Sequence, residues 1–276
     1  MSASSSNVDP PALPYNNLNI VLRYEDANTI LQKYDVTTPV SNINIYRTAL
    51  VHKSYCTRKN ENFLNGNTQC PNDCIPLQEE SNERLEFLGD AVINLIVAKY
   101  LFERYPDENE GFLTKLRTKL VNGTMLANLA NIAEIPKYIL ISKQIEECNG
   151  RNNKKILEDA FEAFLGAMFL DFGDQGYKTV ETWLINLLET EIDFSDLIAS
   201  NNNYKDTLLK HFQHTFNYLP RFYEISTENT ANGKIYNVCV RDKNDTIVAT
   251  GTGPNKKHAE NDCAKNALAR YGIYSL

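Results

Sequence analysis

The hydrophobic period of this chain is mainly helical before about residue 200, whereas strand-like alternation appears after it, and this difference limits the folds that the chain can adopt. From about residue 82 to residue 190 the apolar residues recur at helical spacing. A helical stretch at 204–216 follows, then RFYEIST, IYNVCVRD and TIVATGTG alternate as strands do, and 257–271 is helical again. The sequence therefore predicts a multidomain protein, in which an all-α domain precedes a small α+β domain of the order α-β-β-β-α.

Composition suggests where these domains begin and end. Residues 1–17, rich in Ser, Pro and Asn, are expected to form a disordered leader. The all-α domain is expected over 18–193, with a long surface loop inserted at 56–80, where Asn, Gly and Pro interrupt the helical period. A polar linker is expected at 194–202, and the α+β domain at 203–276.

Charge is distributed unevenly between the two predicted domains. The whole chain carries a net charge of −7, but residues 203–276 hold 10 Lys and Arg against 7 Asp and Glu, which gives +3. The remaining 18 basic and 28 acidic residues give −10 for residues 1–202. A mildly basic module attached to an acidic one indicates a polyanion as partner, with metal ions offsetting the acidic domain.

The chain lacks the sequence features of membrane and secreted proteins. It has neither a run of about 18 apolar residues nor the basic, apolar start of a secretory signal. Its six cysteines follow no disulfide spacing, so we expect free thiols in the cytoplasm. Cys56, Cys70 and Cys74 lack the usual two-residue gap and a convincing fourth ligand, which argues against a zinc site.

Two pairs of carboxylates lie beside apolar stripes. Glu86 and Asp90 are four residues apart, and Asp159 and Glu162 are three apart, so each pair shares one face of its predicted helix. Gly166 lies one turn further along the second helix, where a missing side chain allows close helix approach. The predicted stripes are Leu85, Leu88, Val92, Leu95 and Ile96 in the first helix, and Phe161, Phe164, Leu165, Met168 and Phe169 in the second.

For a single acidic pair, the ordinary explanation is a solvated charged face of an amphipathic helix. Two such pairs at the edge of one core favour a different interpretation, because carboxylates there repel one another unless a cation intervenes. Oxygen ligands without His or Cys are typical of a hard ion such as Mg²⁺, with Mn²⁺ as a possible substitute.

Four sequence blocks resemble those of the ribonuclease III family, in the expected order. NERLEFLGD at 82–90 is similar to the family signature, and ALVHKSY at 49–55, EGFLTKLRTKLV at 110–121 and ILEDAFEAFLGA at 156–167 resemble its other blocks. The resemblance covers about residues 24–190. The C-terminal domain resembles a double-stranded-RNA-binding domain.

The resemblance implies a metal-dependent endonuclease that hydrolyses double-stranded RNA and leaves 5′-phosphate ends with short 3′ overhangs. Glu86, Asp90, Asp159 and Glu162 fall where the family keeps its metal-binding carboxylates, and Asp90 and Glu162 would act in catalysis. Supporting roles are implied for the acidic residues Glu83 and Glu110. Staggered ends require two active sites, so the resemblance implies a homodimer through the nuclease domain, with the signature helix and its small Gly89 and Ala91 at the interface.

Basic residues near the second carboxylate pair are candidates for phosphate contacts. Arg151, Lys154 and Lys155 directly precede that pair, and solvated surface charge is the alternative. A second basic group consists of Lys115, Arg117 and Lys119. His52 is expected to be a packed, hydrogen-bonded residue, because the metal ions would already supply the chemistry.

The predicted RNA-binding domain matches its family in part. Lys256 and Lys257 begin the last predicted helix and are positioned for phosphates. Leu209 stands where the family usually has a groove-reading Gln, and the loop TENTANGKIY lacks Gly-Pro-x-His, which leaves Asn232 and Lys234 as substitutes. We therefore expect weak, mostly electrostatic RNA binding by this domain.

The main alternative is a non-cleaving double-stranded-RNA-binding protein that sequesters RNA, and a third is a structural, ribosome-associated relative. The four intact carboxylates argue against both. Frequent Asn and the insertion at 56–80 suggest a divergent member, and a viral source would make its compartment the host cytoplasm.

Overall fold

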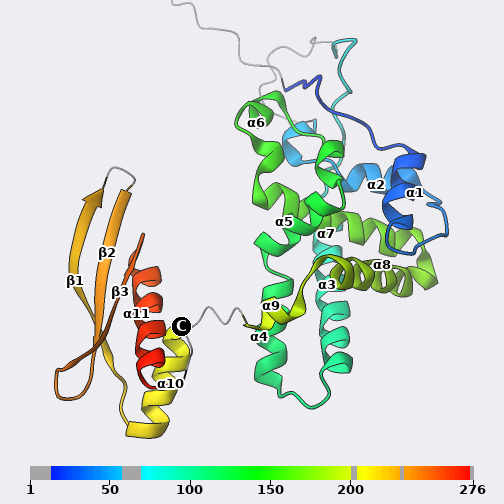
Figure 1. The fold of residues 1–276 in the computed structure, drawn as a ribbon. Helices are drawn as coiled ribbons and strands as arrows, with labels where there is room; N and C mark the ends of the chain where they lie inside the picture. Colours follow the sequence, from blue (N-terminus) through cyan, green and yellow to red (C-terminus); the bar gives the residue numbers. More distant parts are fainter. Residues whose placement is uncertain (1–13, 58–69, 200–203, 231–232, 274–276) are drawn as a thin grey trace, which may run out of the picture. The chain divides into compact units, whose positions relative to one another are not determined.

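A computed structural model describes residues 14–57, 70–199, 204–230 and 233–273. The chain divides into two units after Asp193 (Figure 1). The first unit is helical and the second contains a sheet, so the predicted fold class is confirmed.

The first unit is built around two long helices, α3 (Glu83–Arg104) and α7 (Lys154–Asp171). The other helices of this unit are α1 (Tyr24–Gln32), α2 (Ile43–Ala49), α4 (Glu110–Leu120), α5 (Gly123–Ile132), α6 (Lys143–Glu147) and α8 (Gly176–Glu191). Short 3₁₀ turns are η1 (Lys53–Tyr55), η2 (Ile135–Tyr138), η3 (Gly150–Asn152) and η4 (Gly173–Gln175).

Glycines let α3 and α7 pack along one another almost backbone to backbone. A Cβ on Gly89 would lie 1.8 Å from the Glu162 carbonyl oxygen, and one on Gly166 would lie 2.4 Å from the Leu85 carbonyl oxygen. The predicted close approach at Gly166 is therefore confirmed. Gly89 faces α7 in the interior, so the expectation that it lies at a dimer surface is wrong, whereas Ala91 is exposed.

α7 is buried on most of its surface because neighbouring helices cover it. Phe161 and Phe164 pack with Trp183 of α8, whose Nε1 donates to the Ile30 carbonyl of α1 at 3.0 Å. Asp171, at the end of α7, accepts from the Ser41 and Asn42 backbone amides before α2. These contacts hold the carboxylate-bearing helix in a fixed position.

Part of the expected leader belongs to the folded unit. Asn16 is buried, and its Nδ2 donates to the Ile141 carbonyl at 3.2 Å and to Glu146 at 2.9 Å. The expectation of disorder is therefore wrong for residues 14–17, because buried amide groups tie them to the segment before α7. Residues 1–13 lie outside the described residues.

Part of the expected insertion is also packed. Ile75 and Leu77 pack against Val51, Tyr55 and Leu140, and the Tyr55 hydroxyl donates to the Ile75 carbonyl at 2.6 Å. The described end of the insertion therefore covers a small hydrophobic cluster and is not only a surface loop. Residues 58–69 lie outside the described residues.

The predicted buried stripe of α3 is correct at Leu85, Val92 and Ile96 and wrong at Leu95. Leu95 faces solvent because α7 covers a neighbouring face of the helix, where Ile93 and Val97 are buried instead. Asn82 precedes α3, and its side chain makes no capping hydrogen bond.

The second unit contains helix α10 (Tyr204–Phe216), strands β1 (Arg221–Thr230), β2 (Gly233–Arg241) and β3 (Ile247–Gly253), and helix α11 (Lys256–Arg270). The strands form an antiparallel sheet in the order β1-β2-β3. A short helix, α9 (Phe194–Ala199), lies within the range that was expected to be a linker. Residues 200–203 lie outside the described residues.

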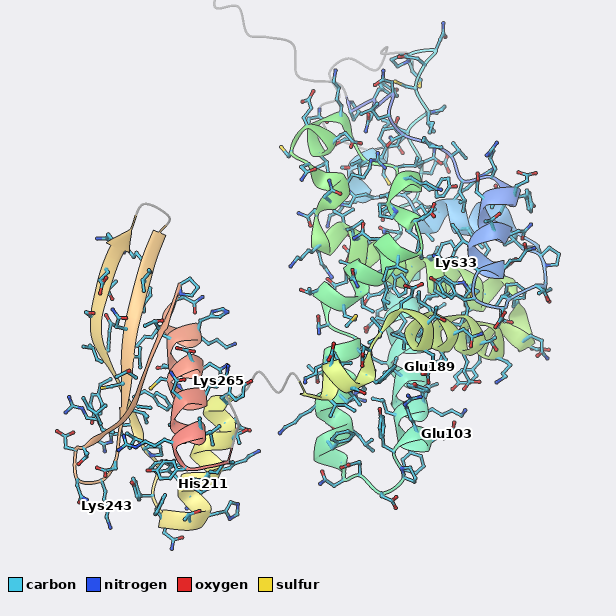
Figure 2. All side chains as sticks on the ribbon, viewed as in Figure 1. Lys33, Glu103, Glu189, His211, Lys243 and Lys265 are labelled. Carbon is cyan, nitrogen blue, oxygen red and sulfur yellow. The ribbon has the colours of Figure 1, made fainter. Side chains whose placement is uncertain are left out.

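The helices of this unit enclose its core against one face of the sheet (Figure 1). Leu208 and Phe212 of α10 and Cys263 of α11 pack against Val240 and Val248. His211, labelled on α10 in Figure 2, lies against the rings of Phe216 and Tyr271, beside this core.

Candidate metal centre

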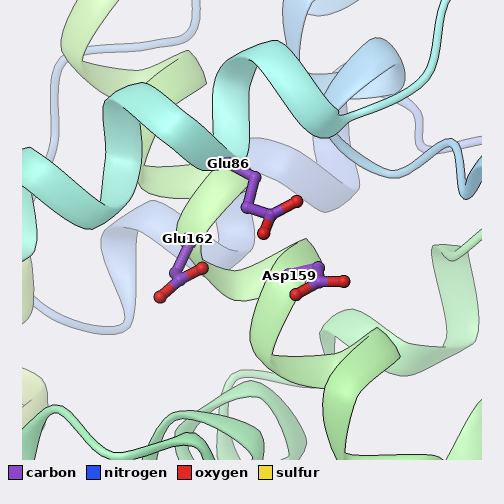
Figure 3. A group of neighbouring side chains, drawn as sticks. All are labelled: Glu86, Asp159 and Glu162. Atoms are coloured by element: carbon purple, nitrogen blue, oxygen red, sulfur yellow. The ribbon is translucent and has the colours of Figure 1, made fainter.

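Three carboxylates meet where α3 crosses α7. Glu86 comes from α3, and Asp159 and Glu162 come from adjacent turns of α7 (Figure 3). Each offers a carboxylate oxygen, and the three oxygens lie within 4.8 Å of one another. The close contact at Gly89 brings the two helices near enough for this convergence. We call these three residues the acidic triad.

Burial and like charge make Glu162 and Glu86 costly to ionise. The Glu162 side chain is 5% exposed, and its burial, followed by the nearby Asp90 and Glu158 charges, raises its pKa to about 8. Burial and then the Asp159 charge raise the pKa of Glu86. Such a centre attracts a cation because a cation relieves the repulsion.

The Lys155 ammonium provides positive charge beside the triad. Its Nζ lies 2.8 Å from Asp159 Oδ1, 3.5 Å from Glu158 Oε2 and 3.8 Å from Glu86 Oε1. The bond to Asp159 raises the lysine's pKa. Asp159 Oδ1 is buried and faces this ammonium. A metal ion at the triad would therefore compete with Lys155 for this oxygen.

Asp90 is not part of the triad in this structure. Its side chain is exposed, and its Oδ1 accepts from Asn94 Nδ2 at 2.8 Å on the next turn of α3. It remains close enough for its charge to be the second cause of the raised Glu162 pKa. Its predicted role as a metal ligand stays a prediction.

The two supporting acids lie apart from the triad. Glu83 is exposed and pairs with Lys53 at 3.2 Å. Glu110, on α4, accepts from the Thr114 hydroxyl at 2.9 Å and lines a groove with Phe102 and Arg117. Their roles stay predictions.

Arg151 occupies an internal network instead of the open surface expected for a phosphate contact. Its Nη1 donates to the Pro136 and Ile139 carbonyls, each at 2.8 Å, and its Nη2 donates to Asn19 Oδ1 at 3.2 Å. Glu146 forms an ion pair with the same guanidinium. Arg151 therefore links residues that precede α7 in the sequence to one another. Lys154, by contrast, is exposed.

His52 and the cysteines lie outside the acidic triad. His52 Nδ1 lies 2.8 Å from Ser54 Oγ, and burial lowers its pKa, as suits a packed histidine. All six cysteines are free thiols, as expected. In the part of the chain that the structure describes, Cys56, Cys70 and Cys74 do not lie close enough to one another to share an ion.

Glu158 was not among the residues predicted for the site. Its spacing from Lys155, three residues along α7, was a visible signal for an ion pair. Its effect on the Glu162 pKa depends on burial, which the spacing does not reveal.

In the second unit, the residues predicted to contact phosphates lie at the start of α11. Lys256 and Lys257 are exposed, Asn255 caps the helix, and Lys256 pairs with Glu224 of β1 at 3.3 Å. Leu209 is half-buried and Lys234 is exposed. Asn232 lies outside the described residues.

Two family models match the chain, one in each unit. Residues 42–188 match the ribonuclease-III-like model, and residues 204–271 match the double-stranded RNA binding motif. The fold and the acidic triad therefore define a class of protein in which a helical nuclease domain precedes a double-stranded-RNA-binding domain. Among the described residues, none of the helices combines the length and apolar character needed to cross a bilayer.

Individual relatives agree with these matches. The probable ribonuclease 3 of Acanthamoeba polyphaga mimivirus is 34% identical over 95% of this chain, which spans 48% of that protein. The ribonuclease 3 of Leptospira interrogans is 33% identical over 83% of this chain and 85% of its own length. The nuclease domain of ribonuclease III from Campylobacter jejuni is a similar solved structure, with a TM-score of 0.49 and 33% identity, covering 62% of this chain and 99% of that one.

The chain belongs to the ribonuclease III family of endoribonucleases. The family is metal-dependent, and the acidic triad could hold a metal ion.

Proposed function

We propose that this protein is an endoribonuclease that hydrolyses the phosphodiester bonds of double-stranded RNA, leaving 5′-phosphate ends and short 3′ overhangs. The convergence of Glu86, Asp159 and Glu162 within 4.8 Å is the observation that carries the proposal. The double-stranded RNA binding motif at 204–271 supports the choice of substrate.

The donor set of the triad suits Mg²⁺, with Mn²⁺ as a substitute. Carboxylate oxygens are the ligands that these hard ions prefer, and the buried Asp159 Oδ1 already attracts a cation, the Lys155 ammonium at 2.8 Å. We infer that Asp90 completes the set by leaving Asn94. When bound, such an ion supplies Lewis acidity at the scissile phosphate.

The protein's own residues would bind and orient the RNA around this centre. Glu162, with its raised pKa, holds a proton at neutral pH and must give it up before it can act as an anionic ligand. Lys155 and the exposed Lys154 would contact the phosphates next to the cleaved bond. Glu83 and Glu110 would support the site from its periphery.

We further propose that the nuclease domain forms a homodimer through α3. Phe87, Leu95 and Phe102 are 82%, 59% and 71% exposed, and spacings of eight and seven residues put them on one face of the helix. Large apolar side chains in a row on a surface are typical of an interaction site. Two copies of the centre would cut the two strands and produce the overhang.

The second unit would hold the duplex mainly by charge. Lys256 and Lys257 at the start of α11 would contact phosphates, so RNA binding should weaken steeply with salt. We take 18–193 as the nuclease domain and 203–276 as the RNA-binding domain, joined by 194–202. The six free thiols favour the cytoplasm as its compartment.

One assay tests the activity. The full-length protein is incubated with long duplex RNA in Mg²⁺ and in EDTA, together with Glu162→Gln and the control Glu147→Gln, which alters an exposed residue of α6. We expect Mg²⁺-dependent cleavage by the wild type and the control, and a loss of at least about a hundredfold in Glu162→Gln. Duplex binding without cleavage by the wild type would support the non-cleaving alternative, and equal cleavage by Glu162→Gln would refute the assigned centre.

A further inference from the structure

Lys155 contacts three carboxylates, and only two of them belong to the acidic triad. Its Nζ lies 2.8 Å from Asp159 and 3.8 Å from Glu86, the triad members. The third partner, Glu158 at 3.5 Å, is outside the triad. The lysine therefore has one anionic partner that a bound metal ion would not occupy.

Glu158 lies against the start of a neighbouring helix. Its side chain is 22% exposed and lies over Gly123, the first residue of α5. A Cβ on Gly123 would lie 2.6 Å from Glu158 Oε2, so the glycine leaves room for the carboxylate. The positive end of the α5 dipole also favours an anion there.

We propose that Glu158 is a positioning residue that retains the Lys155 ammonium beside the metal centre when an ion occupies the acidic triad. The inference rests on the proposed function. A divalent ion at the triad repels Lys155 and competes with it for Asp159 and Glu86. Glu158 then remains as the partner that keeps the ammonium next to the site, where it can contact RNA phosphate.

Positioning Lys155 is a different role from attracting the metal ion directly through negative charge. If Glu158 acts through Lys155, its removal returns the lysine to Asp159, and the lysine then opposes the incoming ion. If Glu158 acts only as a charge, its removal weakens ion binding whether or not Lys155 is present. A double-mutant cycle separates the two cases.

The cycle uses Glu158→Gln, Lys155→Met and the double variant in the full-length protein. Mn²⁺ binding is measured by electron paramagnetic resonance without RNA, which reports on the centre independently of cleavage. We expect Glu158→Gln alone to weaken Mn²⁺ binding about fivefold and to have no effect in the Lys155→Met background. Equal weakening in both backgrounds, or none in either, would overturn the proposal.

Gly123→Ala supplies a second perturbation that leaves Glu158 in the sequence. The added methyl group displaces only the flexible end of Glu158, so the fold should be retained. We expect it to weaken Mn²⁺ binding as Glu158→Gln does, while the charge control Glu147→Gln does not. Wild-type affinity in Gly123→Ala would count against the proposal.

Cleavage kinetics distinguish this inference from the proposed function. Glu158→Gln should raise KM for duplex RNA about threefold or more, and the double variant should match Lys155→Met. In one outcome, the wild-type protein does not cut RNA, while the Mn²⁺ affinities of the variants still show coupling between Glu158 and Lys155. That result would uphold the role of Glu158 and refute the proposed activity. A wild-type protein that binds no Mn²⁺ would refute both.

Discussion

The substitution Glu162→Gln should stabilise the metal-free protein at high pH while it abolishes activity. Burial raises the pKa of the Glu162 carboxyl from 4.5 to about 8 in the folded protein. In the unfolded chain the same carboxyl ionises near its ordinary pKa. The folded state therefore holds a proton that the unfolded chain releases, and raising the pH favours unfolding.

The size of the effect follows from the two pKa values. At about 1.4 kcal/mol per pKa unit, full ionisation costs the folded state about 5 kcal/mol. This cost is absent below about pH 4.5, grows as the pH rises, and is complete above about pH 8. Between about pH 5.5 and pH 8 the contribution of Glu162 should fall by about 3 kcal/mol, whereas a glutamine contributes no such change.

Urea unfolding in EDTA at several pH values measures this difference. Subtracting the wild-type free energy of unfolding from that of Glu162→Gln removes the groups that titrate equally in both proteins. We expect the difference to grow with pH by about 3 kcal/mol, and Glu147→Gln to show no comparable trend. Parallel pH profiles for wild type and Glu162→Gln would refute the reasoning, because they would mean that Glu162 ionises alike in folded and unfolded states.

Three further substitutions test the helix packing, the proposed dimer and the Arg151 network. Gly89→Ala should cost about 3 kcal/mol in urea unfolding, because its Cβ would meet the Glu162 carbonyl at 1.8 Å. Phe87→Asp should shift the protein from dimer to monomer in analytical ultracentrifugation without lowering the melting temperature of the nuclease domain, since the side chain is exposed. Arg151→Ala should lower stability by about 3 kcal/mol, because Glu146 loses its partner, with unchanged RNA affinity in a gel-shift titration.

Local spacing predicted the elements of this protein well because it depends on short stretches of sequence. The spacing of Asp159 and Glu162 put both on one helix face, and Gly166 marked the close contact. Spacing could not decide which face of α3 meets α7, since that depends on residues distant in sequence. Leu95 was therefore expected to be buried and is exposed.

Basic residues were the least predictable part of the site. Arg151 and Lys155 look alike in sequence, as cations just before a carboxylate pair. Arg151 donates to backbone carbonyls in and just after η2 and to Asn19, which is distant from it in sequence. Lys155 instead faces the acids. Only the tertiary positions of these partners separate a structural cation from one at the site.

In the metal-free centre, two features reduce the repulsion among the carboxylates, and both should be lost when an ion binds. Glu162 keeps a proton, and Lys155 places its ammonium on Asp159. An ion that uses Glu162 as a ligand must displace that proton, so its apparent affinity should rise about tenfold per pH unit below about pH 8 and level off above it. Mn²⁺ titrations across this range would measure the slope. A constant affinity would show that the ion binds without Glu162, and the proposed ligand set would then be wrong.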